Sequence, residues 1–191
     1  MRGSMNYKLS PSNLTFLYEG CKRCFYLRTK YNIAQPSIPL PAIFSKIAGL
    51  LEKYYDGKRT DKLHPDLPPG IVKYGEKYVK SDSFNIPGHK DTCFISGRSD
   101  IVIEFDDKSF GVIDFKTGNP KSEYSDLYSR QLHAYAYALE NPSPNSIKLS
   151  PVSFLGLLYF YPSKVSQENV EWLSYDSKIS LVEIKKMTKI F

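Results

Sequence analysis

Two aspartates and a lysine are the residues in this 191-residue chain whose types and spacing best suit a chemical role. Asp114 and Lys116 lie near the end of the apolar run GVIDFK, and Asp100 precedes them by 14 positions. Side chains two positions apart on a strand face the same side, so Lys116 is expected beside Asp114. Two carboxylates held close together repel unless a cation lies between them, and a divalent metal commonly does. Such a group suits phosphodiester hydrolysis, because a metal and an amine both stabilise negative charge on phosphate.

The segments around these residues predict a β-hairpin. Residues 92–105 and 109–115 are expected to form two antiparallel strands, joined by a turn at Asp106-Asp107-Lys108. Asp100 and Asp114 are symmetric about that turn and should therefore lie across from each other, with β-carbons roughly 5 Å apart. Alternatively, both are surface charges at strand ends. The apolar neighbours of Asp114 favour the metal, because an unpaired buried carboxylate is costly.

A helix is predicted directly after the hairpin, over residues 122–140, with Ser122 as its cap. Gln131 and Tyr135 lie four positions apart and so on one face of this helix, where Gln131 can point toward the end of the hairpin. Tyr135 also belongs to an apolar stripe, and taken alone such a residue is more often part of the core.

The rest of the chain predicts further helices and strands. Residues 10–31 are expected to form one helix or two, with a break near Gly20. Residues 41–55 should form an amphipathic helix, and residues 151–161 read as a central strand buried on both faces. The remaining expectations are a helical turn and strand in 71–87, a strand at 169–175 and a helix at 177–190. The apolar stripe of the amphipathic helix consists of Ile43, Ile47, Leu50, Leu51 and Tyr54. The order of elements indicates an α/β fold with a mixed central β-sheet flanked by helices.

Charge is unevenly distributed along the chain. Residues 1–90 carry 15 Lys and Arg against 7 Asp and Glu, whereas residues 91–191 carry 11 against 13. The basic half could hold a polyanion over the acidic site, or it could be an ordinary solvated surface.

Composition narrows the remaining possibilities. No apolar run is long enough to span a bilayer, so no membrane association is expected. Three cysteines without a disulfide-rich pattern fit a reducing, cytoplasmic setting. Residues 1–4 (MRGS) are interpreted as a remnant of expression cloning, and residues 5–191 as a single domain.

Three strings, taken together, resemble a known family: GRSD at 97–100, VIDFKTG at 112–118 and QLHAY at 131–135. They are similar to the motifs of the PD-(D/E)xK nuclease superfamily, and most similar to its RecB-type exonuclease branch, which includes the CRISPR-associated adaptation nucleases. The resemblance covers roughly residues 9–175 and implies a restriction-endonuclease-like core.

The resemblance also implies roles for individual residues. Asp100, Asp114 and the backbone carbonyl of Phe115 would bind Mg²⁺ or Mn²⁺, and Lys116 would be the catalytic lysine. Gln131 and Tyr135 would belong to the helical motif that lines the active site and the DNA path.

Two features depart from the RecB-type pattern. Many members of that branch have a histidine metal ligand on the first core helix, and Ala48 stands at that place here. Mg²⁺ tolerates one protein ligand fewer because it keeps several waters, whereas preference for Mn²⁺ should weaken without the softer imidazole. Glu52 and Glu76 are candidates to supply an acid instead. Cys21 and Cys24 have no cysteine partners after Cys93, which argues against the iron–sulfur cluster of some relatives.

These observations lead us to expect a metal-dependent nuclease that hydrolyses DNA, with single-stranded DNA or DNA ends as the expected partner. Two alternatives stay open: a catalytically weak or inactive module that binds nucleic acid or a protein partner, and an α/β protein whose acids hold a structural ion.

Overall fold

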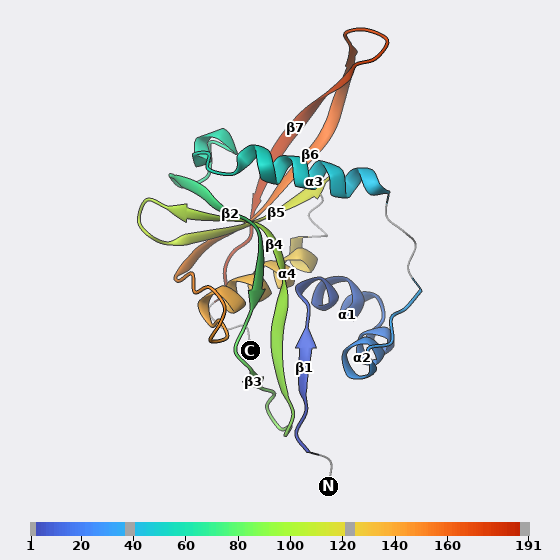
Figure 1. The fold of residues 1–191 in the computed structure, drawn as a ribbon, viewed down its shortest axis with the longest axis vertical. Helices are drawn as coiled ribbons and strands as arrows, with labels where there is room; N and C mark the ends of the chain where they lie inside the picture. Colours follow the sequence, from blue (N-terminus) through green and yellow to red (C-terminus); the bar gives the residue numbers. More distant parts are fainter. Residues whose placement is uncertain (1–2, 37–40, 121–124, 188–191) are drawn as a thin grey trace.

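A seven-stranded mixed sheet forms the centre of the molecule (Figure 1). The computed structural model describes residues 3–36, 41–120 and 125–187. The strands are β1 (Asn6–Leu9), β2 (Gly70–Lys80), β3 (Phe84–Asn85), β4 (Thr92–Phe105), β5 (Phe110–Thr117), β6 (Val152–Gln167) and β7 (Leu173–Glu183). Their order is β1-β4-β5-β6-β7, and both β2 and β3 pair with β4. The β1–β4 and β5–β6 pairs are parallel and the others antiparallel, which confirms the predicted mixed α/β fold.

Helices lie on both faces of this sheet. They are α1 (Tyr18–Gly20), α2 (Lys22–Tyr31), α3 (Ala42–Tyr55) and α4 (Ser125–Glu140), together with a π-helical turn, η1 (Asn13–Leu17), and a 3₁₀ turn, η2 (Thr60–Lys62). Helix α4 connects the parallel strands β5 and β6, as such a pair requires. No helix among the described residues is long and apolar enough to cross a membrane.

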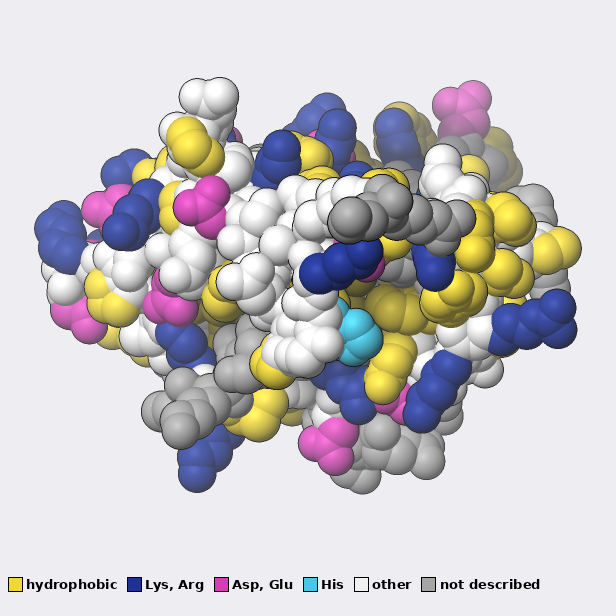
Figure 2. All heavy atoms as spheres, turned by 90° about the horizontal axis from the view of Figure 1, so that it is seen from below, with side chains coloured by type: hydrophobic (Ala, Val, Ile, Leu, Met, Phe, Trp, Pro, Cys, Tyr) yellow, Lys and Arg dark blue, Asp and Glu magenta, His cyan; other side chains and the backbone are white. Residues whose placement is uncertain are grey.

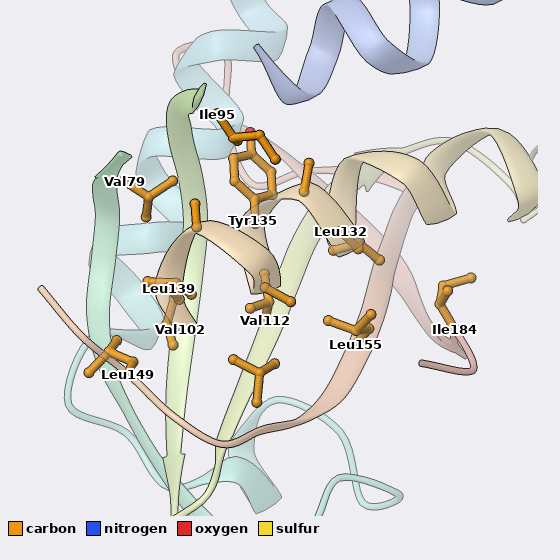
Figure 3. Close-up of a cluster of buried hydrophobic side chains, with 14 of the residues drawn as sticks. Val79, Ile95, Val102, Val112, Leu132, Tyr135, Leu139, Leu149, Leu155 and Ile184 are labelled. Carbon is orange, nitrogen blue, oxygen red and sulfur yellow. The ribbon is translucent and has the colours of Figure 1, made fainter. Parts of the chain in front are cut away.

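Two hydrophobic clusters fill the space between the sheet and its helices. Alternate residues of β4 and β5 contribute to each, because successive strand side chains point to opposite faces. Val102 and Val112 pack with Leu132 of α4, as Figure 3 shows. Ile101 and Ile113 pack on the other face, where Tyr55 of α3 joins them. The end of the hairpin is thus held between two packed layers.

The first part of the chain differs in detail from the sequence-based expectation. The predicted helix over 10–31 is divided as expected, but at Cys21, whose backbone is extended. Strand β1 before it was not predicted. Within 71–87 the expected helical turn is wrong, since β2 is a strand from Gly70 onward. The predicted cap Ser122 lies outside the described residues.

Helix α3 packs differently from the predicted stripe. Tyr55 is buried, whereas Ile43, Leu50 and Tyr54 are exposed. The helix therefore contacts the sheet through a narrower face, in which Ile47 and Leu51 are partly buried against the cluster.

The helix predicted over 177–190 is wrong. Those of its residues that lie in β7 form a strand antiparallel to β6, and the predicted strand at 169–175 overlaps the start of β7. Strand β6 also runs beyond the expected end at 161, to Gln167. Pairing with the long β6 satisfies the β7 backbone and so overrides its weak helical pattern.

Candidate active site

The ends of β4 and β5 bring the two aspartates together. Ile101 pairs with Ile113 in the antiparallel ladder, which makes Asp100 and Asp114 the next positions across the two strands, as the symmetry about the turn predicted. The backbone N–H of Phe115 donates a 2.7 Å hydrogen bond to Oδ2 of Asp100. This bond ties the Asp100 carboxylate to the strand that carries Asp114.

Asp114 is almost completely buried, with 3% of its surface exposed. Gln131 Nε2 donates a 3.0 Å hydrogen bond to its Oδ1, and Lys116 forms an ion pair with its Oδ2. Burial raises the pKa of Asp114, and the Lys116 ammonium opposes that rise. The Asp114 carboxylate is thus held by Lys116 of its own strand and by Gln131 of α4.

Lys116 faces the same side of β5 as Asp114, as the two-residue period predicted. Only 15% of its side chain is exposed. Its Nζ lies 4.2 Å from the centre of the Tyr128 ring, within the range of a cation–π contact. The amine is therefore held in a defined place beside the acids.

Gln131 and Tyr135 both face the acids from α4. Gln131 Nε2 lies 3.5 Å from the Tyr135 hydroxyl, and burial raises the pKa of that phenol. Tyr135 also packs among the core side chains (Figure 3), so both of its predicted environments are observed. Gln131 Oε1 is buried without a hydrogen-bond partner among the described residues.

Asp100 is the acid whose charge the site perturbs most clearly. Burial, with the nearby charge of Asp114, raises its pKa to about 7, although the Phe115 N–H and Lys116 favour the ionised form. Glu52 of α3 adds a smaller unfavourable charge. Burial and the charge of Glu76 raise the pKa of Glu52 in turn. The negative charge of Glu52 on α3 therefore acts on Asp100.

This arrangement can be compared with known proteins. The family model of the PD-(D/E)XK nuclease superfamily matches residues 50–180, a span that contains both acids, Lys116 and Gln131. The chain belongs to the PD-(D/E)XK nuclease superfamily. The crystal structure of SSO0001 shares the fold, with a TM-score of 0.53 and 18% sequence identity over 95% of this chain and 69% of that one. None of the curated proteins matches the chain.

The donor set of this PD-(D/E)XK site fits a hard divalent cation. Two carboxylates lie together with raised pKa values, and of the described side chains only Lys116 forms an ion pair with them. Carboxylate and carbonyl oxygens are the ligands that Mg²⁺ prefers. The described residues contain no group of three or more His, Cys, Asp or Glu side chains able to hold a metal.

The other residues considered for this site, at position 48, at Glu76 and at the cysteines, have different surroundings. Ala48 lies one helical turn before Glu52 on α3, so a side chain there would face the same way. Glu76 instead forms an ion pair with Arg98, with 2.9 Å between oxygen and nitrogen. Cys21 caps α2 by accepting a hydrogen bond from the Cys24 N–H, and all three cysteines are free thiols.

Sequence reasoning missed the role of Tyr128 as a support for Lys116. The signal was present, because Tyr128 precedes Gln131 by three positions and so shares its side of the helix. Tyr128 is only partly buried against the core.

Proposed function

We propose that this PD-(D/E)XK protein is a metal-dependent deoxyribonuclease of the RecB-type branch, acting on single-stranded DNA or DNA ends. The observation that carries the proposal is the pairing of the buried Asp114 with the partly buried Asp100, with Lys116 and Gln131 bound to Asp114. A fold alone does not assign an activity, but this arrangement of acids, amine and amide suits phosphodiester hydrolysis.

Asp100, Asp114 and the backbone carbonyl of Phe115 would hold Mg²⁺ or Mn²⁺. When bound, the metal supplies a polarised phosphate and a water of lowered pKa. The chain contributes the placement of its acids. The Phe115 N–H orients the Asp100 carboxylate, and Gln131 does the same for Asp114.

Lys116 would act on the developing negative charge. Its ammonium is paired with Asp114 and lies over the Tyr128 ring. Nζ would stabilise negative charge on a phosphate oxygen or orient the attacking water. The Tyr128 ring would keep the amine within reach of the reacting atoms.

Replacement of Asp114 tests the proposal. Asp114→Ala should lower metal-dependent cleavage of labelled single-stranded DNA by about a hundredfold or more, because a metal ligand and the partner of Lys116 are both lost. Asp114→Asn is the matched control for shape and should lose activity to a similar degree. Cleavage is measured with Mg²⁺, Mn²⁺ or EDTA, and folding by circular dichroism. Full cleavage by either folded variant would refute the assignment.

A second candidate function is a catalytically weak module that binds DNA or a protein partner. The observation that favours it is Ala48, at the place where many RecB-type members carry a histidine ligand. Position 48 offers a direct test, because the charge of Glu52, one turn later on α3, raises the pKa of Asp100.

Ala48→His should therefore add an imidazole ligand to the site. We expect Mn²⁺-supported cleavage to rise about tenfold, with a smaller change in Mg²⁺, because imidazole favours the softer ion. Isothermal titration with Mn²⁺ gives a readout independent of activity, and Ala48→Gln is the control for side-chain size. Unchanged Mn²⁺ affinity in the histidine variant would show that position 48 does not face the metal.

A further inference from the structure

A pocket on the N-terminal side of the molecule lies outside the acid site. Its volume is about 560 Å³, within the range of ligand-binding pockets. Strand β1, helix α2 and the start of β4 contribute to it, and α4 closes one side. Its aromatic and aliphatic lining includes Tyr7, Leu9, Leu14, Tyr18, Phe25 and Tyr26.

Cations surround the aromatic rings of this pocket. Lys22 Nζ and Arg130 Cζ each lie 5.5 Å from the centre of the Tyr18 ring. Lys30 Nζ lies 5.0 Å from the Tyr26 ring and 2.8 Å from its hydroxyl. Figure 2 shows hydrophobic side chains gathered at the right, over the N-terminal helices, with Lys and Arg side chains around them. Rings bordered by ammonium and guanidinium groups suit a ligand that is flat and carries negative charge.

Ring contacts beside the acid site and the short backbone connection from η1 to Tyr18 link that site to this pocket. Lys116 lies over Tyr128, and Tyr128 meets the edge of Phe16 with 5.7 Å between ring centres. Phe16 belongs to η1, which packs on α4 and leads into Tyr18 at the pocket. The exposed fractions of Phe16 and Tyr18 are 49% and 38%. An extended ligand lying across these rings would have one end at Lys116 and the other at the pocket.

Two acidic side chains near the pocket, Asp91 and Glu19, each have a polar partner. Asp91 accepts a hydrogen bond from the Met5 N–H, and Glu19 forms an ion pair with Arg130. Three basic side chains, Lys22, Lys30 and Arg130, border the rings of this pocket. Charge therefore favours a polyanion over an apolar peptide.

We propose that this pocket holds the unstacked bases of a single-stranded nucleic acid whose scissile phosphate lies at the Asp100–Asp114 site. The inference rests on the proposed nuclease function and adds a second contact region to it. Tyr18 and Tyr26 stack on bases, and Lys22 and Lys30 contact phosphates. Stacking recognises the flat face of any base and is therefore sequence-tolerant. The pocket and the rings beside it should bind nucleic acid whose bases are unpaired and exclude base-paired strands.

The test measures binding in EDTA, where a metal-dependent nuclease does not cut. Fluorescence anisotropy gives Kd for fluorescein-labelled dT12 and for a 12-mer of abasic residues with the same phosphates. The wild type should bind dT12 about tenfold or more tightly than the abasic strand. Tyr18→Ala and Tyr26→Ala should each reduce that ratio several-fold, whereas Tyr18→Phe, which keeps the ring, should preserve it.

Two further variants separate the possible causes. Tyr175→Ala removes an exposed ring from β7, at the far end of the molecule (Figure 1), and should leave both Kd values unchanged. Lys30→Gln should weaken binding of both strands alike and reduce the salt dependence by about one counterion.

The outcomes distinguish this proposal from the nuclease assignment. Wild-type Kd values in folded Tyr18→Ala and Tyr26→Ala, or equal losses for dT12 and the abasic strand, would overturn the pocket whether or not DNA is cleaved. Failure of the wild type to bind dT12 would also overturn it and would leave an apolar protein segment as the occupant to seek. A stacking pattern without cleavage in Mg²⁺ or Mn²⁺ would uphold the pocket and reject the nuclease.

Discussion

The protonation state of Asp100 is set by its neighbours. An ordinary aspartate is ionised above pH 4, yet burial and the charge of Asp114 raise the pKa of this one to about 7. The proton that Asp100 keeps near neutrality is one that a metal must displace, so metal binding and the ionisation of Asp100 are linked.

This linkage gives a stability prediction with a definite sign. Between about pH 4 and pH 7 the folded protein holds a proton on Asp100 that the unfolded chain has released, so the free energy of unfolding should fall as pH rises through that window. Asp100→Asn removes the effect. In EDTA at pH 7.5 we expect this variant to be more stable than the wild type by about 1–3 kcal/mol.

Urea unfolding from pH 4.5 to 7.5 provides the measurement. The difference between wild type and Asp100→Asn isolates Asp100 from the other carboxyl groups. Parallel stability curves over this range would show that Asp100 titrates normally.

At the scale of elements, Pro11, which precedes η1, approaches β4 closely at Gly97. A β-carbon built at Gly97 would lie 2.8 Å from Cδ of Pro11 and 3.4 Å from the Tyr135 ring. The absence of a side chain there lets the N-terminal segment lie against the strand that carries Asp100. This close approach therefore places the N-terminal segment against β4, three residues before Asp100.

Gly97→Ala should force these elements apart. We expect a loss of about 1–3 kcal/mol in the free energy of unfolding, the usual cost of overpacking, and weaker binding of dT12. Gly75→Ala in the neighbouring strand is the matched control, because its β-carbon would meet nothing within 4 Å. Urea unfolding measures the difference between the two variants, and equal stability would contradict the close contact.

The elements nearest the acids were predictable from sequence, because local chemistry determines them. The turn at 106–108 fixes the hairpin register, and the register places Asp100 opposite Asp114. The four-residue spacing on α4 likewise placed Gln131 and Tyr135 on one side.

The elements that were wrongly predicted depend on distant partners. The residues of β7 alternate too weakly to distinguish strand from helix, and only pairing with β6 decides between them. The side of α3 that faces the sheet is likewise determined by tertiary packing, which buries Tyr55 and leaves Tyr54 exposed. The contact of Lys116 with Tyr128 joins separate elements, so the helical spacing shows only which side of α4 the ring lies on and not that it meets the amine.

At the scale of the whole molecule, the sheet separates two differently built ends. The N-terminal helices lie toward one end, and the β6–β7 hairpin extends from the other (Figure 1). Beyond Phe160 the side chains of β6 are exposed on both faces, and Trp172 near the tip is 67% exposed. The acid site lies between these ends, where β4, β5 and α4 meet.

The position of β7 at the border of the sheet has a further consequence. Among the described residues β7 pairs only with β6, so its outer row of N–H and C=O groups is open to any extended segment, whatever that segment's sequence. Asp176, Lys178 and Glu183 place charge along this open edge, and burying them against a like strand would be costly. The same charges that keep copies of the chain from adding to one another's sheets would select, among foreign strands, one of complementary charge pattern.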